Sequence, residues 1–253
     1  MEKLRKIIGD ADFVLIGIGS EFGCKDIEPE LMEIYSKKKE ETPEEDWVVP
    51  FLESFGCENE LMEKIKRAYD NLYELVKDKN YFVVTLNNDD KIMDSPFLKD
   101  KITAPCGSLR RLQCVQGCKD SIVEGETIIE EVIADIKKSN LSLDEIPRPI
   151  CSQCGREMVM NTVEQEKYME EGYIKSWEKY RMWLTGTLNK KICLLELGVD
   201  FKYPSIIRWA FEKVAFINEK AVMVRINEKY PQLTEELQGK AYSYEKNSVE
   251  FFQ

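Results

Sequence analysis

The sequence predicts an α/β fold, a Rossmann-like and mostly parallel sheet with helices on both faces, plus a small zinc-binding insert. Three observations lead to this class. Short apolar runs, typical of strands buried on both faces, alternate with segments whose apolar residues recur at helical spacing. The first apolar run ends in two glycines, as at a tight strand-to-helix turn. Two cysteine pairs interrupt the pattern in the middle of the chain, with the spacing of a metal site.

The first third of the chain contains two predicted strands and a predicted helix. The run Phe13–Ile16 is a short, continuous apolar segment and predicts a buried parallel strand. Residues 25–57 are charged and broken by three prolines, so we expect a helical excursion or lid there. Asn59 can cap a helix over about 60–78, whose apolar residues share one face. The run Tyr81–Thr85 predicts the second strand.

The remaining elements continue the alternation of helices and strands. Apolar spacing predicts an amphipathic helix near 127–138 and a longer helix over about 164–189. The runs 192–195 and 221–226 are short and apolar and predict two further buried strands. A helix is expected to begin between them at Pro204, because proline is favoured in the first helical turn. We therefore expect residues 1–104 and 161–253 to form the Rossmann-like domain and residues 105–160 the zinc-binding module.

Composition excludes several classes of function. The 253 residues carry a net charge of −11 with no long basic stripe, which argues against nonspecific binding to nucleic acid. The N-terminus lacks the apolar core of a signal peptide, and no apolar run approaches the roughly 20 residues of a membrane span. Eight cysteines without a secretion signal indicate a reducing, cytoplasmic environment. The chain has no histidine, so no Ser-His-Asp triad, Cys-His dyad or histidine metal centre exists.

Four cysteines form the strongest local signal for a bound metal. Cys114 and Cys118 are spaced C-x3-C, and Cys151 and Cys154 are spaced C-x2-C. Each pair can present two thiolates from one turn, so together the pairs fill a tetrahedral zinc site. A filled thiolate shell leaves no position for water, so we expect the zinc to be structural. Buried free thiols are the alternative, and a disulfide framework is less favoured in a chain of this length.

Polar residues that directly follow each predicted strand are the candidate site residues. In parallel sheets the ligand crevice lies at the carboxyl ends of the strands. The glycines of the first turn let a backbone approach a phosphate, although the same pattern also occurs in a simple tight turn. The Asn/Asp segment after the second strand is either an Asx-rich turn or a cluster that holds a ribose or a cationic ring. The candidates are Gly17, Gly19, Ser20, Asn87, Asn88, Asp89, Asp90, Glu196, Gly198, Asn227 and Glu228.

Taken in order, these motifs resemble those of the sirtuins, the NAD-dependent protein deacylases and ADP-ribosyltransferases. The resemblance covers most of the chain, and the combination is far more specific than any one motif. It implies a Rossmann-like NAD-binding fold and the structural zinc site. Four segments of this chain correspond to family motifs: Gly17–Gly19 corresponds to Gly-Ala-Gly, Thr85–Asp89 to Thr-Gln-Asn-Ile-Asp, Cys106–Leu109 to His-Gly-Ser-Leu, and Ile226–Asn227 to Ile-Asn. The four zinc cysteines match as well.

One segment narrows the resemblance to a branch of the family. Leu194–Pro204 replaces the common Gly-Thr-Ser phosphate motif and is similar to the Glu-Leu-Gly-Val segment of the macrodomain-linked class M sirtuins. This branch implies ADP-ribosylation of a protein acceptor, with a lipoylated carrier protein as the known kind of target. The resemblance implies that Asn87 and Asp89 act at the nicotinamide ribose. It also implies that Gly17, Gly19, Ser20, Thr85, Asn87, Asp89, Glu196, Gly198 and Asn227 bind NAD.

Three residues depart from the family pattern and keep other functions open. Cys106 stands where the family has its catalytic histidine, and a free thiol is a poor base near neutral pH. Glu21 and Asp200 add negative charge where the resemblance places the cofactor. The main interpretation is therefore a sirtuin-like NAD-dependent ADP-ribosyltransferase in which Cys106 lies at the catalytic position. A catalytically inactive binding or regulatory module, and a weak deacylase or NAD hydrolase, are the alternatives.

Overall fold

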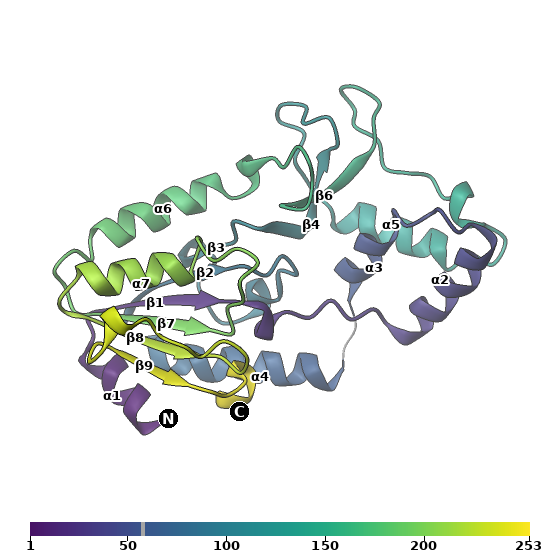
Figure 1. The fold of residues 1–253 in the computed structure, drawn as a ribbon. Helices are drawn as coiled ribbons and strands as arrows, with labels where there is room; N and C mark the ends of the chain where they lie inside the picture. Colours follow the sequence, from purple (N-terminus) through teal and green to yellow (C-terminus); the bar gives the residue numbers. More distant parts are fainter. Residues whose placement is uncertain (57–58) are drawn as a thin grey trace.

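A computed structural model describes residues 1–56 and 59–253 of the chain (Figure 1). Within that part of the chain, a six-stranded sheet has the order β3-β2-β1-β7-β8-β9, and every neighbouring pair is parallel. This is the strand order of the Rossmann fold and confirms the predicted class. The strands are β1 (Phe13–Ile18), β2 (Asn80–Thr85), β3 (Ile102–Thr103), β7 (Ile192–Leu197), β8 (Ala221–Ile226) and β9 (Ala241–Tyr244).

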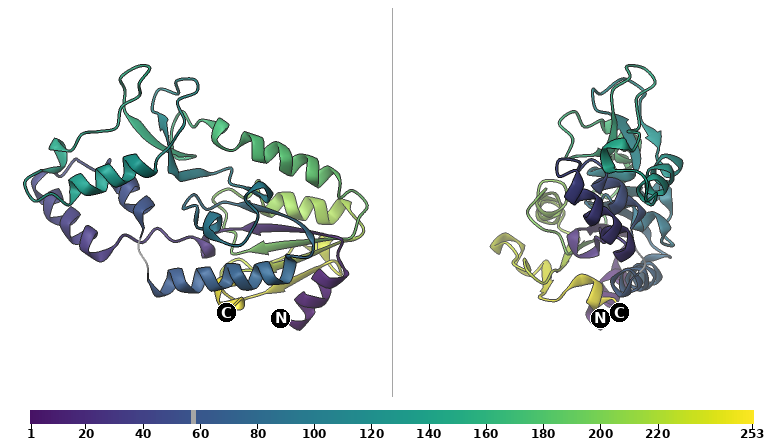
Figure 2. Two further views of the ribbon diagram at one scale, coloured as in Figure 1. Left: turned by 180° about the vertical axis from the view of Figure 1, so that it is seen from behind. Right: turned by 90° about the vertical axis from the view of Figure 1, so that its right-hand side faces the viewer.

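Helices cover both faces of this sheet, as predicted. Figures 1 and 2 show one layer made by α1 (Glu2–Asp10), α4 (Glu60–Val76) and α8 (Ser248–Phe251) and another made by α6 (Ile174–Thr185) and α7 (Arg208–Ile217). Alternate residues of each strand pack toward opposite layers, as in Val14 and Leu15 of β1. The side chain of Asn59 accepts a hydrogen bond from the Met62 amide at 2.9 Å, so the predicted helix cap is confirmed.

A smaller unit projects beyond the carboxyl ends of the strands (Figure 1). Its described residues include a three-stranded antiparallel sheet of order β5-β4-β6 and one continuous apolar cluster. Helices of the 25–57 excursion join that cluster through Leu31, Phe51 and Leu52. The last residue of the excursion, Cys57, lies outside the described residues. The elements are α2 (Pro29–Glu41), α3 (Val49–Phe55), β4 (Gly107–Cys114), β5 (Val123–Glu124), α5 (Glu126–Ile136) and β6 (Met158–Thr162).

Two helix predictions were too long. The helix expected over 164–189 begins only at Ile174, and the helix expected from Pro204 begins at Arg208. Residues 164–169 form a loop, because buried amide side chains satisfy its backbone at Met169. Gln113 Oε1 accepts from the Met169 amide at 2.9 Å, and Asn161 Nδ2 donates to the Met169 carbonyl at 2.9 Å. Short 3₁₀ helices in the described chain are η1 (Ser20–Phe22), η2 (Lys91–Asp94), η3 (Lys99–Lys101), η4 (Leu143–Glu145), η5 (Glu170–Gly172) and η6 (Glu235–Leu237).

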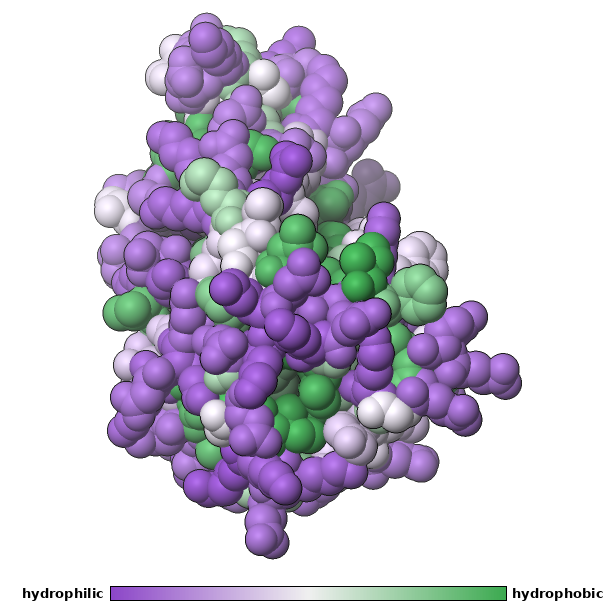
Figure 3. All heavy atoms as spheres, turned by 90° about the vertical axis from the view of Figure 1, so that its left-hand side faces the viewer, coloured by the Kyte–Doolittle hydropathy of each residue, from purple (hydrophilic) through white to green (hydrophobic). Residues whose placement is uncertain are grey.

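The surface at the opposite end of the sheet is mostly hydrophilic. In Figure 3 its hydrophobic residues form small separate groups among polar side chains. Exposed apolar residues of the chain include Leu188, Phe216 and Ile217, which are more than half exposed. Isolated apolar groups of this kind are normal on a protein surface. Among the described helices, none combines the length and the apolarity that crossing a bilayer requires.

Candidate functional site

Two glycine turns meet at the carboxyl ends of β1 and β7, where the strand order of the sheet reverses direction. The Gly19 amide donates to the Leu197 carbonyl at 2.8 Å, and a Cβ on Gly19 would lie 2.4 Å from the Gly198 carbonyl oxygen. Gly198 has a φ of +58°, and a Cβ there would lie 2.4 Å from the Cβ of Glu21. Both positions therefore require glycine. Both glycines are buried against each other and Glu21, at the point where Rossmann-like sheets bind their ligands.

The other residues of the first turn have different surroundings. A Cβ on Gly17 would lie 2.4 Å from Ile207 and 2.9 Å from Phe211, so this glycine lets α7 pack closely on β1. The Ser20 hydroxyl lies 3.5 Å from the Gly198 carbonyl oxygen and faces the cavity described next. Gly17 thus allows the close packing of α7 beneath the turn, whereas Ser20 lines the cavity in which a ligand could bind.

A cavity of about 320 Å³ lies beside the glycine turns and collects many of the predicted site residues. Among its lining residues are Ser20, Asn87, Asp89 and Cys106, all of which the sequence marked as candidates. The predicted cofactor-binding residues that do not line it are Gly17, Gly19, Thr85, Glu196, Gly198 and Asn227. The described lining residues are Ser20, Gly23, Lys25, Leu86, Asn87, Asn88, Asp89, Cys106, Glu164, Asp200, Lys202 and Tyr203.

The segment after β2 is fixed by hydrogen bonds to the first glycine turn. Thr85 Oγ1 accepts from the Asn87 amide at 3.1 Å, and Asn87 Nδ2 donates to the Gly19 carbonyl at 3.0 Å. The Asp89 carboxylate accepts from the Cys24 amide at 2.8 Å and from the Lys91 amide at 3.1 Å. Burial raises the pKa of Asp89, and these two backbone amides partly offset that effect. The arrangement holds a polar amide and a carboxyl group rigidly at the base of the cavity.

Cys106 lies directly before β4 and is 2 % exposed. Burial, together with the nearby Glu164 carboxylate, raises the pKa of the Cys106 thiol to about 12. The thiol is therefore protonated at neutral pH. In this state it is neither a nucleophile nor a general base. Cys106 lines the cavity, and its chemistry there is that of a small apolar wall residue.

Glu164 and Lys202 line the cavity and were not among the predicted site residues. Lys202 Nζ lies 3.0 Å from Glu164 Oε1, and this ion pair joins the loop after β7 to the loop after β6. Asn88 Nδ2 donates to Glu164 Oε2 at 3.4 Å. Glu164 closely follows β6, whose mixed polar and apolar residues form no strand pattern in the sequence. It was missed because the segment was interpreted as the start of a helix.

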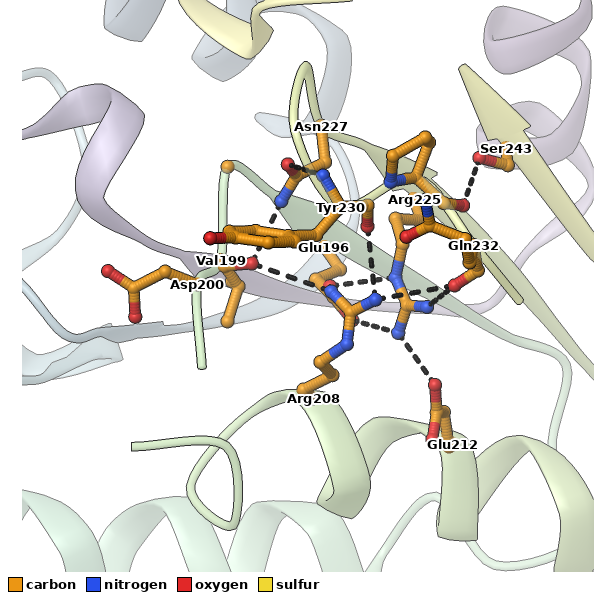
Figure 4. A network of polar contacts seen from close by, with 12 residues as sticks. Glu196, Val199, Asp200, Arg208, Glu212, Arg225, Asn227, Tyr230, Gln232 and Ser243 are labelled. Carbon is orange, nitrogen blue, oxygen red and sulfur yellow. Dashed lines mark hydrogen bonds and ion pairs between the residues drawn. The ribbon is translucent and has the colours of Figure 1, made fainter. Parts of the chain in front are cut away.

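Glu196 is completely buried and pairs with two arginines (Figure 4). Arg225 of β8 donates to both Glu196 carboxylate oxygens at 2.8 Å, and Arg208 of α7 lies 3.2 Å from the nearer one. Arg225 also contacts Glu212 at 2.8 Å. The two arginines also donate hydrogen bonds to backbone carbonyls of the loop after β8. Arg208 donates to the Tyr230 and Gln232 carbonyls, and Arg225 donates to the Gln232 carbonyl. Glu196 therefore organises the loops beneath the crevice and does not face the cavity.

Asn227 and Glu21 are likewise engaged within the protein. Asn227 Nδ2 donates to the Val199 carbonyl at 2.8 Å, and its Oδ1 accepts from the Tyr230 amide at 2.7 Å. One oxygen of Glu21 accepts from the Glu228 amide at 2.8 Å, and the other accepts from the Ser248 hydroxyl at 2.6 Å. The Glu21 charge is thus balanced by backbone and hydroxyl donors, and it points away from the cavity lining.

The four predicted metal cysteines come together at the tip of the smaller unit. The sulfur atoms of Cys114, Cys118, Cys151 and Cys154 all lie within 4.8 Å of one another. Tetrahedral zinc with Zn–S bonds of about 2.3 Å places its sulfur ligands about 3.8 Å apart, so this cluster fits the ion. A backbone turn holds each pair, with the Gly117 amide donating to the Cys114 carbonyl and the Gly155 amide donating to the Cys151 carbonyl, both at 2.8 Å. The cluster can therefore hold a structural zinc ion.

Comparison with solved structures defines the class of fold. A structure described as Sir2 bound to acetylated peptide has a TM-score of 0.58 and 15% identity, and the match covers 100% of this chain and 95% of that chain. A second Sir2 structure has a TM-score of 0.59 and 13% identity, with coverage of 99% and 93%. A Sir2 variant solved with a p53 peptide and NAD also has a TM-score of 0.58 at 15% identity, over 100% of this chain and 95% of that one. The chain has the sirtuin fold.

Two curated proteins are similar in sequence, although no family model matches the chain. A protein ADP-ribosyltransferase of Staphylococcus aureus (strain Mu50 / ATCC 700699) is 23% identical over 258 residues, which is 94% of this chain and 81% of that protein. A probable bifunctional ADP-ribose hydrolase/ADP-ribosyltransferase of Fusarium oxysporum f. sp. cubense is 26% identical over 150 residues. That match covers 57% of this chain and 25% of the fungal protein. Within the sirtuin fold, this chain is thus similar to proteins named for ADP-ribosyl transfer.

Proposed function

We propose that this protein cleaves NAD and transfers the ADP-ribosyl group to a protein acceptor. The observation that carries the proposal is the cavity beside Gly19 and Gly198, where Asn87 and Asp89 are held in place and no imidazole is present. The names of the two similar proteins support transfer of ADP-ribose. The Sir2 structures with NAD and with peptide support a dinucleotide and a protein as the reactants.

The residues divide into those that hold NAD and those that act on it. Gly19, Ser20 and Gly198 lie where the diphosphate of a dinucleotide meets a Rossmann-like sheet. Asn87 and Asp89 face the cavity, where the nicotinamide ribose would lie. As the bond from ribose to nicotinamide breaks, positive charge develops on the sugar, and polar or anionic neighbours stabilise it. Thr85, Gly17, Glu196 and Asn227 support these groups by holding the strand ends and loops in position.

The state of Cys106 favours ADP-ribosyl transfer over deacylation. Deacylation of the sirtuin type needs a base that activates a ribose hydroxyl. Cys106 occupies the corresponding place, and its pKa of about 12 keeps the thiol protonated. Losing a positioned general base lowers a rate about 10²–10⁴-fold, so deacylation would be weak. A weak deacylase or NAD hydrolase activity would be a side reaction of the same site.

The proposal includes a structural role for zinc and a protein acceptor. Zinc held by Cys114, Cys118, Cys151 and Cys154 would fix the tip of the smaller unit. The acceptor would bind where this unit meets the sheet, and a lipoylated carrier protein is the kind of target that we propose. The lack of a basic stripe in this acidic chain argues against a nucleic-acid target. We place the reaction in the reducing cytoplasm, where zinc-binding thiols persist.

Calorimetric binding of NAD combined with nicotinamide release tests this function. We expect micromolar binding and slow release, both strongly reduced by Asn87→Ala. The matched control is Asn140→Ala, which changes the same side chain at an exposed site in the smaller unit. NAD that binds without any release of nicotinamide would instead favour a catalytically inactive binding or regulatory module. Failure to bind at millimolar NAD would refute the proposed function.

A further inference from the structure

Carboxylates in the cavity differ in what their oxygens already contact. Asp89 is 6 % exposed, and its two oxygens accept from the Cys24 and Lys91 amides. Asp200 Oδ1 accepts from the Lys202 amide at 2.9 Å within its own loop. Glu164 is different, because 42% of its side chain is exposed, although its oxygens contact the Lys202 ammonium and the Asn88 amide group. Of the carboxylates that line the described cavity, Glu164 is therefore the most accessible to a bound reactant.

The backbone fixes Glu164 next to the position of the missing imidazole. The amide of Val163, the residue before Glu164, donates to the Cys106 carbonyl at 3.0 Å. This hydrogen bond joins the end of β6 to the residue that stands in the catalytic position. Both Glu164 and Cys106 line the same cavity. A carboxylate is thus placed beside a thiol that cannot act as a base.

We propose that Glu164 is the general base for ADP-ribosyl transfer and that Lys202 is its positioning residue. This inference rests on the proposed function. In the transfer step the bond from ribose C1′ to nicotinamide breaks, and its electron pair leaves with neutral nicotinamide. A lone pair of the acceptor forms the new bond to C1′, and the proton of the acceptor passes to a Glu164 oxygen. The acceptor group therefore carries a removable proton, as a hydroxyl, amide, amine or water does.

The charges around Glu164 keep it ionised, which is the form that accepts a proton, and they also make it a weaker base than a free glutamate. Burial acts to raise its pKa, but the Lys202 ammonium and the Thr162 hydroxyl outweigh this and lower the pKa below the usual value. Glu164 is therefore ionised throughout the neutral range. Removing Lys202 would raise the pKa, so that Glu164 becomes protonated at a higher pH. The other titratable and charged groups that line the cavity are Lys25, Asp89, Cys106, Asp200 and Tyr203.

The experiment uses NAD as the donor and separates bond cleavage from proton transfer. Water and molar methanol serve as acceptors that carry a proton, and exchange of labelled nicotinamide into NAD reports cleavage of the glycosidic bond alone. We expect Glu164→Gln to lower hydrolysis and methanolysis about 10²–10⁴-fold while NAD binding and nicotinamide exchange persist. The matched control is Glu166→Gln, an exposed glutamate on the same loop, which should change neither reaction. Glu164→Asp should restore part of the rate.

The pH profile distinguishes a base from a merely structural residue. Lys202→Met should move the acidic limb of the hydrolysis profile to higher pH, because the lost ammonium no longer lowers the pKa of Glu164. Unchanged hydrolysis in Glu164→Gln would overturn the assignment, and so would parallel loss of exchange and NAD binding. A wild-type protein that exchanges nicotinamide but reacts with neither water nor methanol would also overturn it. A wild-type protein that does not bind NAD refutes the proposed function itself, which is a separate outcome.

Discussion

Replacing Glu196 with glutamine tests whether the buried charge network holds the site loops together. The substitution keeps the shape of the side chain but removes its negative charge. A glutamine oxygen at the Oε1 position would keep the contacts of Arg225 Nε at 2.8 Å and of Arg208 at 3.2 Å, but only as hydrogen bonds to a neutral group, and Arg225 would lose its second contact at 2.8 Å. A glutamine amide would also turn donor hydrogens toward a guanidinium, which has no acceptor. Two buried cations would then face one remaining carboxylate, Glu212.

The loss of stability expected for Glu196→Gln depends on how deeply the ion pair is buried and on which partner Arg225 keeps. Removing one partner of a buried ion pair costs about 3–5 kcal/mol. Glu196 and Arg225 have side chains that are 0% exposed, but Arg225 keeps Glu212 at 2.8 Å, so the lower end of the range applies. A loss of about 3 kcal/mol corresponds to a fall in Tm of about 6–12 °C for a chain of this length.

Urea unfolding followed by circular dichroism measures this change, provided the transition is two-state and its slope m is unchanged. Glu212→Gln is the matched control. It removes a carboxylate that contacts the same arginine, but its side chain is 17% exposed and water can replace the bond. We expect a clearly smaller loss there. A Glu196→Gln loss below about 1 kcal/mol, or one equal to the control, would refute the structural role assigned to Glu196.

Three further predictions concern the metal cluster, the buried thiol and the glycine turn. The purified protein should contain about one zinc ion per chain, and Cys151→Ser should lower both metal content and Tm, as measured by elemental analysis and thermal unfolding. Cys106 should resist iodoacetamide between pH 7 and 9, because its raised pKa of about 12 leaves almost no thiolate there; rapid alkylation, seen by peptide mass spectrometry, would contradict this. Gly198→Ala should destabilise the fold by more than about 1 kcal/mol, since the methyl group adds a clash with Glu21 to the strain of a positive φ. Gly239→Ala is its control in urea unfolding, because that glycine also has a positive φ but has nothing within 4 Å of the added Cβ.

The main sheet could be predicted because its central strands have a local signature. Strands buried on both faces are continuous apolar runs, and the runs at 13–16, 81–85, 192–195 and 221–226 all became strands. The smaller sheet was not predicted, because β4 and β6 mix polar and apolar residues. Their polar side chains, such as Gln113 and Asn161, are buried with partners elsewhere in the chain. Hydrogen bonds between such distant side chains depend on the tertiary structure, so they produce no periodic pattern of apolar residues in the sequence.

The candidate site was predictable to the extent that it depends on the ends of parallel strands. Asn87 and Asp89 reached the cavity because consecutive strand ends meet at one edge of the sheet. Glu196 shares that edge, but its direction depends on Arg208 and Arg225, which lie 12 and 29 residues away. Lys202 had no local signal, since its role depends on a glutamate from the other sheet. Long-range ion pairs of this kind cannot be read from spacing along the chain.

The smaller unit is discontinuous in sequence, and this affects how the chain is made. Leu52 of α3 belongs to the same apolar cluster as Met160 of β6, although more than a hundred residues separate them along the chain. At a synthesis rate of about 5–20 residues per second, the apolar sides of α2 and α3 wait roughly 5–20 s for their partners. Contacts between such distant segments also slow folding, because a large loop must close before they form. A nascent chain that stalls before β6 would therefore expose these helices to aggregation or to chaperones.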